Sequence, residues 1–118
     1  MMEKNIKKEI LLKTDSTWVN NKFNQININN PEVTVLKITI PPNMQLPMHK
    51  HPLINIAYVN KGDLTIIMES GDSRTFKQGE SFAEVIEDFH YGKNNSSDTV
   101  ELIVFYIGEK DTALSVNK

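Results

Sequence analysis

Short apolar segments rich in β-branched residues recur along this chain with turn signals between them, and they limit the fold more than any other feature. A strong example covers residues 33–40 and stops at Pro41 and Pro42, because proline cannot donate a hydrogen bond to a β-ladder. Further strands are expected at residues 9–13, 53–59, 64–68, 82–86 and 100–107. No window keeps the apolar spacing of a helix, so we expect little helix. The pattern predicts an all-β sandwich or barrel.

The length of 118 residues predicts a single domain, with a core barrel at about residues 33–107 and an N-terminal strand segment within residues 1–30. The net charge of −2 offers no basic surface to nucleic acid and does not favour anionic membranes. The chain has no cysteine, no signal-peptide pattern and no apolar run approaching the roughly 20 residues of a membrane span. We therefore expect a cytoplasmic protein without a nucleic-acid or membrane partner.

The three histidines of the sequence have a spacing that suits a metal site. His49 and His51 flank a single residue, and His90 follows in a later segment. In an extended strand, residues two apart project from the same face with Cα atoms roughly 6.6 Å apart, so both imidazoles of the pair can reach one cation. A later strand folded against the first can add His90. The spacing therefore predicts a three-histidine metal site.

The segment after the histidine pair is apolar on both faces. One face carries His49, His51, Leu53, Asn55, Ala57 and Val59, and the other carries Ile54, Ile56 and Tyr58. The histidine face should point inward, while the opposite face needs a cover from another segment or another subunit, because two-sided apolar strands are normally covered on both sides. We therefore expect a homodimer, with residues 9–18 adding cover within one subunit or by exchange between subunits.

Two motifs in the chain resemble those of the cupin family. The first is matched by His49, His51 and Gly62, and the second by Gly79, His90 and Asn94. The resemblance covers roughly residues 33–107 and uses every histidine present. It implies a double-stranded β-helix, or jelly-roll barrel, in which His49, His51 and His90 bind one divalent metal ion of Fe, Mn, Ni, Cu or Zn. A cupin that has lost its metal is the alternative.

Two parts of the chain depart from the family pattern. Val85 and Glu87 replace the proline and glycine of the turn that normally presents the third histidine, which puts that turn in doubt. Asn55 stands where the family usually has a glutamate ligand. Three neutral imidazoles and a neutral amide would leave a divalent cation its full charge, which strengthens its action on a carbonyl or on bound water. Asn55 either ligates the metal, although an amide oxygen is a poor ligand for such metals, or only hydrogen-bonds near the site.

Glu84 is the candidate catalytic residue. It interrupts the apolar stretch at residues 82–86, where a buried unpaired carboxylate would be costly. If it faces the barrel, it can be a metal ligand or a base with a raised pKa. If it faces outward, it is an ordinary surface residue of an edge strand.

The sequence leaves two functions open, because the cupin fold hosts many unrelated tasks. The first is a metal-dependent enzyme acting on a small molecule, of the dioxygenase, isomerase, lyase or decarboxylase type, since three protein ligands leave coordination positions open. The second is a non-catalytic module that binds or senses a small molecule in the barrel. Leu53, Phe82 and Phe105 are expected to line the pocket and to make it partly apolar.

Overall fold

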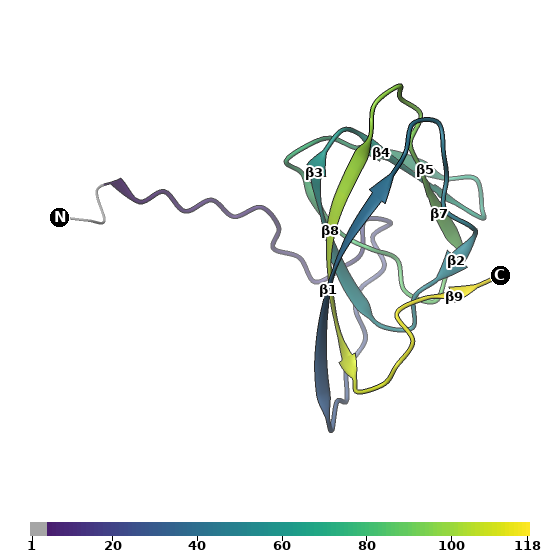
Figure 1. Ribbon diagram of the computed structural model, residues 1–118. Coiled ribbons are helices and arrows are strands. Elements are labelled where there is room, and N and C mark those ends of the chain that lie inside the picture. The colour runs from purple at the N-terminus through teal and green to yellow at the C-terminus, as the bar shows by residue number, and fades with distance from the viewer. Residues whose placement is uncertain (1–4) are drawn as a thin grey trace.

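The computed structural model describes residues 5–118, and two antiparallel sheets form its core (Figure 1). One sheet has the strand order β1-β8-β3-β6 and the other the order β5-β4-β7-β2-β9. The strands are β1 (Pro31–Ile40), β2 (His49–Lys50), β3 (Ile54–Lys61), β4 (Leu64–Met68), β5 (Ser73–Phe76), β6 (Ser81–Ala83), β7 (His90–Lys93), β8 (Val100–Glu109) and β9 (Val116–Asn117). No α-helix occurs between residues 5 and 118, and so no helix in this range could cross a membrane. The predicted all-β double-stranded β-helix is confirmed.

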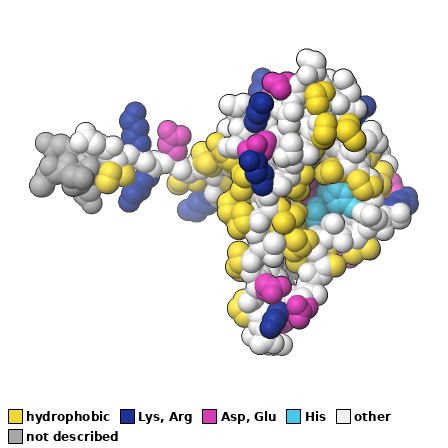
Figure 2. Space-filling model, viewed as in Figure 1, with side chains coloured by type: hydrophobic (Ala, Val, Ile, Leu, Met, Phe, Trp, Pro, Cys, Tyr) yellow, Lys and Arg dark blue, Asp and Glu magenta, His cyan; other side chains and the backbone are white. Residues whose placement is uncertain are grey.

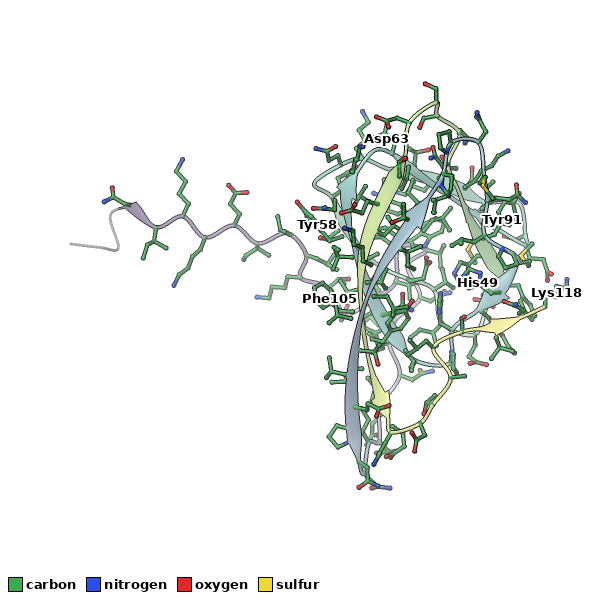
Figure 3. The ribbon with its side chains drawn as sticks, in the orientation of Figure 1. His49, Tyr58, Asp63, Tyr91, Phe105 and Lys118 are labelled. Atoms are coloured by element: carbon green, nitrogen blue, oxygen red, sulfur yellow. The ribbon has the colours of Figure 1, made fainter. Side chains whose placement is uncertain are left out.

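Alternation along β8 separates the core from the outer surface. This strand pairs with β1 on one side and β3 on the other, so its inner side chains lie at the centre of the core. The inner side chains are Val100, Leu102, Val104 and Tyr106, and all are buried. Phe105 has the opposite parity and is 45% exposed, on the side of β8 away from His49 (Figure 3). The expectation that Phe105 lines the pocket is therefore wrong. Phe82 lines the cavity beside the histidines as expected, whereas Leu53 is buried but is not among the residues that line this cavity.

The N-terminal residues form an arm. The strand expected at residues 9–13 is wrong, because this segment has no ladder partner within residues 5–118 and runs away from the barrel (Figure 1). Ile10 and Leu11 are 78% and 54% exposed. The chain meets the barrel further on, where the Trp18 backbone N–H donates to the carbonyl of Ala83 at 3.1 Å. A single chain thus leaves apolar side chains of its arm uncovered.

The glycines of the two sequence motifs lie in turns between strands. Gly62 and Gly79 have positive φ angles of 78° and 90°, a backbone region that glycine enters without steric cost. At Gly62 a Cβ atom would also lie 3.0 Å from the Val100 side chain, so any other residue would crowd that side chain as well. The strand predicted at residues 82–86 is shorter than expected, since β6 ends at Ala83 and the chain then bends toward the turn before β7.

Candidate metal centre

The fold brings the three histidines together on the inner side of one sheet. His49 lies on β2, His51 follows that strand directly, and His90 begins β7, where it is the register partner of His49. The candidate ligand atoms of the three side chains lie within 4.8 Å of one another. In Figure 2 the histidine side chains are visible in an opening of the molecular surface. The predicted proximity of the three imidazoles is confirmed, and metal binding by them stays a prediction.

Hydrogen bonds orient all three imidazoles in the same sense. Each Nδ1 atom lies close to a backbone carbonyl oxygen: His49 to Pro47 at 2.7 Å, His51 to Leu114 at 2.8 Å and His90 to Asp88 at 2.9 Å. A carbonyl oxygen can only accept, so each Nδ1 carries the proton and each Nε2 keeps a lone pair. Metal-binding histidines are oriented by this kind of second hydrogen bond. The Nε2 atom of His90 is buried and has no hydrogen-bond partner among the described residues, so its lone pair is suited to a cation.

Burial keeps these imidazoles neutral. It is the largest cause that lowers the pKa of His49 and His90, and it lowers the pKa of His51 to about 4. Neutral imidazole is the form that binds a metal, since a protonated ring has no free lone pair. At neutral pH all three side chains are therefore ready to act as ligands without first losing a proton.

Glu84 faces the histidines from the end of β6. Its side chain is buried, so the alternative of an ordinary surface residue is wrong. Its Oε2 atom lies 3.6 Å from the Nε2 atom of His90. This separation is too long for a hydrogen bond, and a neutral His90 offers only a lone pair there. Two electron-rich atoms in this arrangement leave room for a proton or a cation between them.

Hydrogen bonds hold the other oxygen of Glu84 in place. Its Oε1 atom accepts the indole N–H of Trp18 and the backbone N–H of Val85, both at 2.9 Å. Burial nevertheless raises the pKa of the Glu84 carboxyl, and these two hydrogen bonds only partly oppose that effect. The sequence analysis does not identify this contact between Trp18 and Glu84. No local signal could have found it, because 66 residues separate the two positions.

The turn that presents His90 forms despite the two substitutions in the family motif. Glu87 occupies the position of the motif's glycine and adopts a positive φ of 65°. Its backbone N–H donates to the carbonyl of His51 at 2.8 Å, which ties the turn to the first pair of histidines. Its carboxylate lies 3.7 Å from the ammonium group of Lys50. The substituted turn therefore still places the third histidine, at the cost of a strained backbone.

A cavity of about 250 Å³ adjoins the histidines inside the barrel. Most of its lining is apolar, with Leu36, Ile38, Leu64, Ile66, Phe82, Leu102 and Val104 among the wall residues. Its polar lining includes Asn55 and Tyr106 in addition to the histidines and Glu84. Tyr106 is missed by the sequence interpretation, although the alternation along β8 could have placed it on the inner face. A shape of this kind can enclose a small molecule next to the imidazoles.

Two antiparallel sheets that close over three convergent imidazoles define a β-barrel protein with a candidate metal centre. The model of the cupin domain matches residues 36–106, and the chain belongs to the cupin family. No curated protein matches the chain. The family assignment predicted from the two motifs is confirmed.

Solved structures with a similar fold include proteins of different function. The DMSP lyase DddQ from Ruegeria pomeroyi shares 20% identity with a TM-score of 0.63, over 73% of this chain and 43% of that one. The polyketide cyclase RemF from Streptomyces resistomycificus shares 18% identity with a TM-score of 0.61, over 75% of this chain and 61% of that one. A cupin domain from Bordetella pertussis shares 18% identity with a TM-score of 0.58, over 81% and 97% of the two chains. The chain thus spans less than two thirds of the lyase and of the cyclase, and the likeness shows the fold alone.

Proposed function

We propose that this protein is a metal-dependent cupin enzyme that acts on a small molecule. The observation that supports the proposal best is the convergence of three Nε2 lone pairs beside a buried carboxylate in a mostly apolar cavity that opens to the surface. His49, His51 and His90 would hold one divalent ion of Fe, Mn, Ni, Cu or Zn and leave coordination positions open, as catalytic sites do. The reaction is of the dioxygenase, isomerase, lyase or decarboxylase type.

The side chains of the site have different roles in the proposed reaction. When bound, the metal ion supplies Lewis acidity toward an oxygen atom of the substrate. Glu84 takes up and returns a proton at Oε2, because burial raises the pKa of this carboxyl and so makes it a better base than an exposed carboxylate. Trp18 and Val85 hold Oε1 and so keep Oε2 directed at the substrate. The apolar wall limits the access of water to both groups.

The test combines metal analysis with turnover. The purified chain is loaded with each of Fe, Mn, Ni, Cu and Zn, and the metal content is measured before activity is followed with a panel of small acids, phenols and diketones. We expect one metal equivalent per chain and oxygen consumption or product formation with a member of the panel. A chain that stays empty of every metal would refute the proposed metal centre.

A binding or sensing module is the second candidate function. Glu84 is the only carboxylate among the described residues that line the cavity, so the site has no second acidic group to complete an acid–base pair. A sensor needs only the cavity and the metal ion. Saturable binding of a panel member by the metal-loaded chain, without turnover of any member, would favour this second function.

We also propose that the protein is a homodimer. Apolar side chains lie in register across the outer face of β1, β8 and β3: Val33 and Val35 beside Ile107 and Phe105, and Ile54 and Ile56 on the far side. The first four of these side chains are 44% to 64% exposed. Figure 2 shows hydrophobic side chains gathered on this side of the molecule. A twofold contact would cover the same face on both subunits. The cytoplasmic location expected from the sequence stays a prediction.

A further inference from the structure

Two polar side chains in the cavity have no role in the proposed metal site. Asn55 is 2% exposed, and its Nδ2 atom has no hydrogen-bond partner among the described residues. Tyr106 is its register partner on the neighbouring strand, so the two side chains lie side by side on the inner face of the sheet. Both line the same cavity as the histidines, and the Tyr106 ring lies 6.0 Å from the ring of His51.

A buried amide N–H group without a partner is costly, and such groups in native structures usually serve a ligand or a water molecule. Asn55 carries two donor hydrogens on Nδ2, and Tyr106 carries one on its hydroxyl. The pKa of Tyr106 is raised to about 12, chiefly by burial, so its hydroxyl keeps the proton at neutral pH. Both residues therefore bring hydrogen-bond donors to the lining of the same cavity.

The charges around the cavity indicate the sign of that acceptor. No lysine or arginine is among the described residues that line it, and the only arginine, Arg74, lies 5.0 Å over the Phe76 ring. Three neutral imidazoles and one carboxylate, that of Glu84, cancel at most one charge of a divalent ion. At least one positive charge is left uncompensated, which favours an anion as the ligand.

We propose that Asn55 and Tyr106 form a donor pair that binds the oxygen atoms of a small monocarboxylate, whose apolar body fills the rest of the cavity. This inference rests on the proposed metal site, because the metal ion supplies the charge that the carboxylate balances. Hydrogen bonds from neutral donors to a carboxylate are stronger than those to neutral acceptors. The donor pair thus separates a carboxylate from an alcohol or hydrocarbon of the same shape.

The volume of the cavity limits the size of the acid. An apolar cavity of roughly 150 Å³ is enough to bind benzene, and this cavity measures about 250 Å³. A single aromatic ring or a short branched chain therefore fits beside the carboxylate, whereas a sugar would leave hydroxyl groups unpaired against the apolar wall. Benzoate and isobutyrate are suitable probes.

The test measures binding to the full chain loaded with Co²⁺, whose absorption spectrum reports a change of ligand at the metal. Benzoate, isobutyrate and benzyl alcohol are titrated into the parent and into Asn55→Leu, Asn55→Ala, Tyr106→Phe and the Asn55→Leu/Tyr106→Phe double variant. Asn55→Ala removes the donor without adding a charge or a larger apolar group, so it covers a failure of Asn55→Leu to fold. Asn95→Leu and Tyr91→Phe are the matched controls, because neither residue lines the cavity.

We expect the parent to bind benzoate at least tenfold more tightly than benzyl alcohol. Each single variant should weaken benzoate binding about 10- to 100-fold, the range for hydrogen bonds to a charged group, with an unchanged cobalt content. The double variant should lose less than the product of the two single effects, because both residues contact one carboxylate. The controls should bind benzoate as the parent does.

Three results would overturn the inference. If the Asn55 and Tyr106 variants keep cobalt and bind benzoate as tightly as the parent does, these two residues do not bind the carboxylate. A parent that holds cobalt at the three histidines but binds neither carboxylate excludes the substrate class and leaves the metal site standing. A parent that takes up no cobalt refutes the proposed function and this inference together.

Discussion

At the scale of single residues, the protonation of the histidines and of Glu84 links the candidate site to stability. The pKa of His51 is lowered to about 4, and burial also lowers the pKa of His49 and His90. Below pH 6.5 the unfolded chain therefore binds more protons at these residues than the folded chain does, so stability falls as the pH drops toward 4. Glu84 has the opposite effect on stability. Because the pKa of its carboxyl is raised in the folded chain, protonation of Glu84 at lower pH stabilises the folded state relative to the unfolded state.

We therefore expect the metal-free chain to lose stability between pH 6.5 and pH 4, by an amount on the order of 1–3 kcal/mol. Glu84→Gln should make this loss steeper, since it removes the group with the opposite dependence. Urea unfolding at several pH values in the presence of a chelator measures how the free energy of unfolding depends on pH in the parent and in Glu84→Gln. A stability of the parent that is level over this range would contradict the neutral state of the buried histidines.

Glu84 itself gives a second prediction at this scale. Glu84→Gln keeps an oxygen to accept from Trp18 and Val85 but cannot carry a proton at the second position. We expect turnover to fall by about 100-fold or more, in the range that general acid–base catalysis contributes, while the loaded chain stays folded. The matched control is Glu80→Gln, where the carboxylate accepts only the backbone N–H of Lys77. Equal turnover in Glu84→Gln and the parent would exclude the catalytic role.

The histidines give a third prediction. Replacing His49, His51 or His90 by alanine should weaken metal binding sharply and leave the fold intact, because each removes one of three ligands but no part of a ladder. Metal content and circular dichroism are the two measurements. Loss of folding in all three variants would instead indicate a structural role for the imidazoles.

At the scale of elements, the turn between β6 and β7 has a strained backbone and also positions His90. Glu87 has a φ of 65°, which costs a residue with a Cβ atom roughly 1–2 kcal/mol. We expect Glu87→Gly to be about 1 kcal/mol more stable than Glu87→Ala, since both remove the ion pair with Lys50 and only glycine relieves the backbone. Thermal unfolding of the two variants compares them directly. Equal stabilities would show that the turn is not strained, and metal affinity should be the same in both.

At the scale of the whole molecule, the exposed outer sheet face and the free arm lead to the prediction of a dimer. Light scattering should give twice the monomer mass of 13.5 kDa. A double variant, Val35→Lys with Phe105→Lys, should be monomeric, because it places charges at the centre of the apolar face. Thr75→Lys on the exposed strand β5 is the control. A monomeric parent with an intact fold would contradict the dimer.

The arm decides between two forms of that dimer. Removing residues 1–13 should weaken the dimer if the arm of one subunit covers the other, since Ile10 and Leu11 would then be buried between subunits. If the two sheet faces meet directly, the shortened chain should remain a dimer of the same strength. Light scattering over a range of concentrations separates these two outcomes.

The sequence alone predicts those features of the fold and the site that depend on local patterns of residues. Alternation of apolar residues depends only on the period of the strand, so it indicated the all-β fold, most of the strand that ends at Ile40 and the inward face of β3. The two histidine motifs, which are also local in the sequence, indicated the family and the three candidate ligands. Periodicity does not reveal which segments pair, however, and so the apolar residues 9–13 predicted a strand although this segment has no ladder partner in the part of the chain that the structure describes.

Contacts between distant segments were decided by the tertiary structure. The indole N–H of Trp18 holds the carboxylate of Glu84 across 66 residues, and no local pattern contains that contact. The register of β3 against β8 places Asn55 beside Tyr106 and turns Phe105 outward. A shift of one residue in this register would exchange the two faces of β8, because its side chains alternate with a period of two. Sequence thus determined which residues can serve the site, and the pairing of strands decided which of them meet.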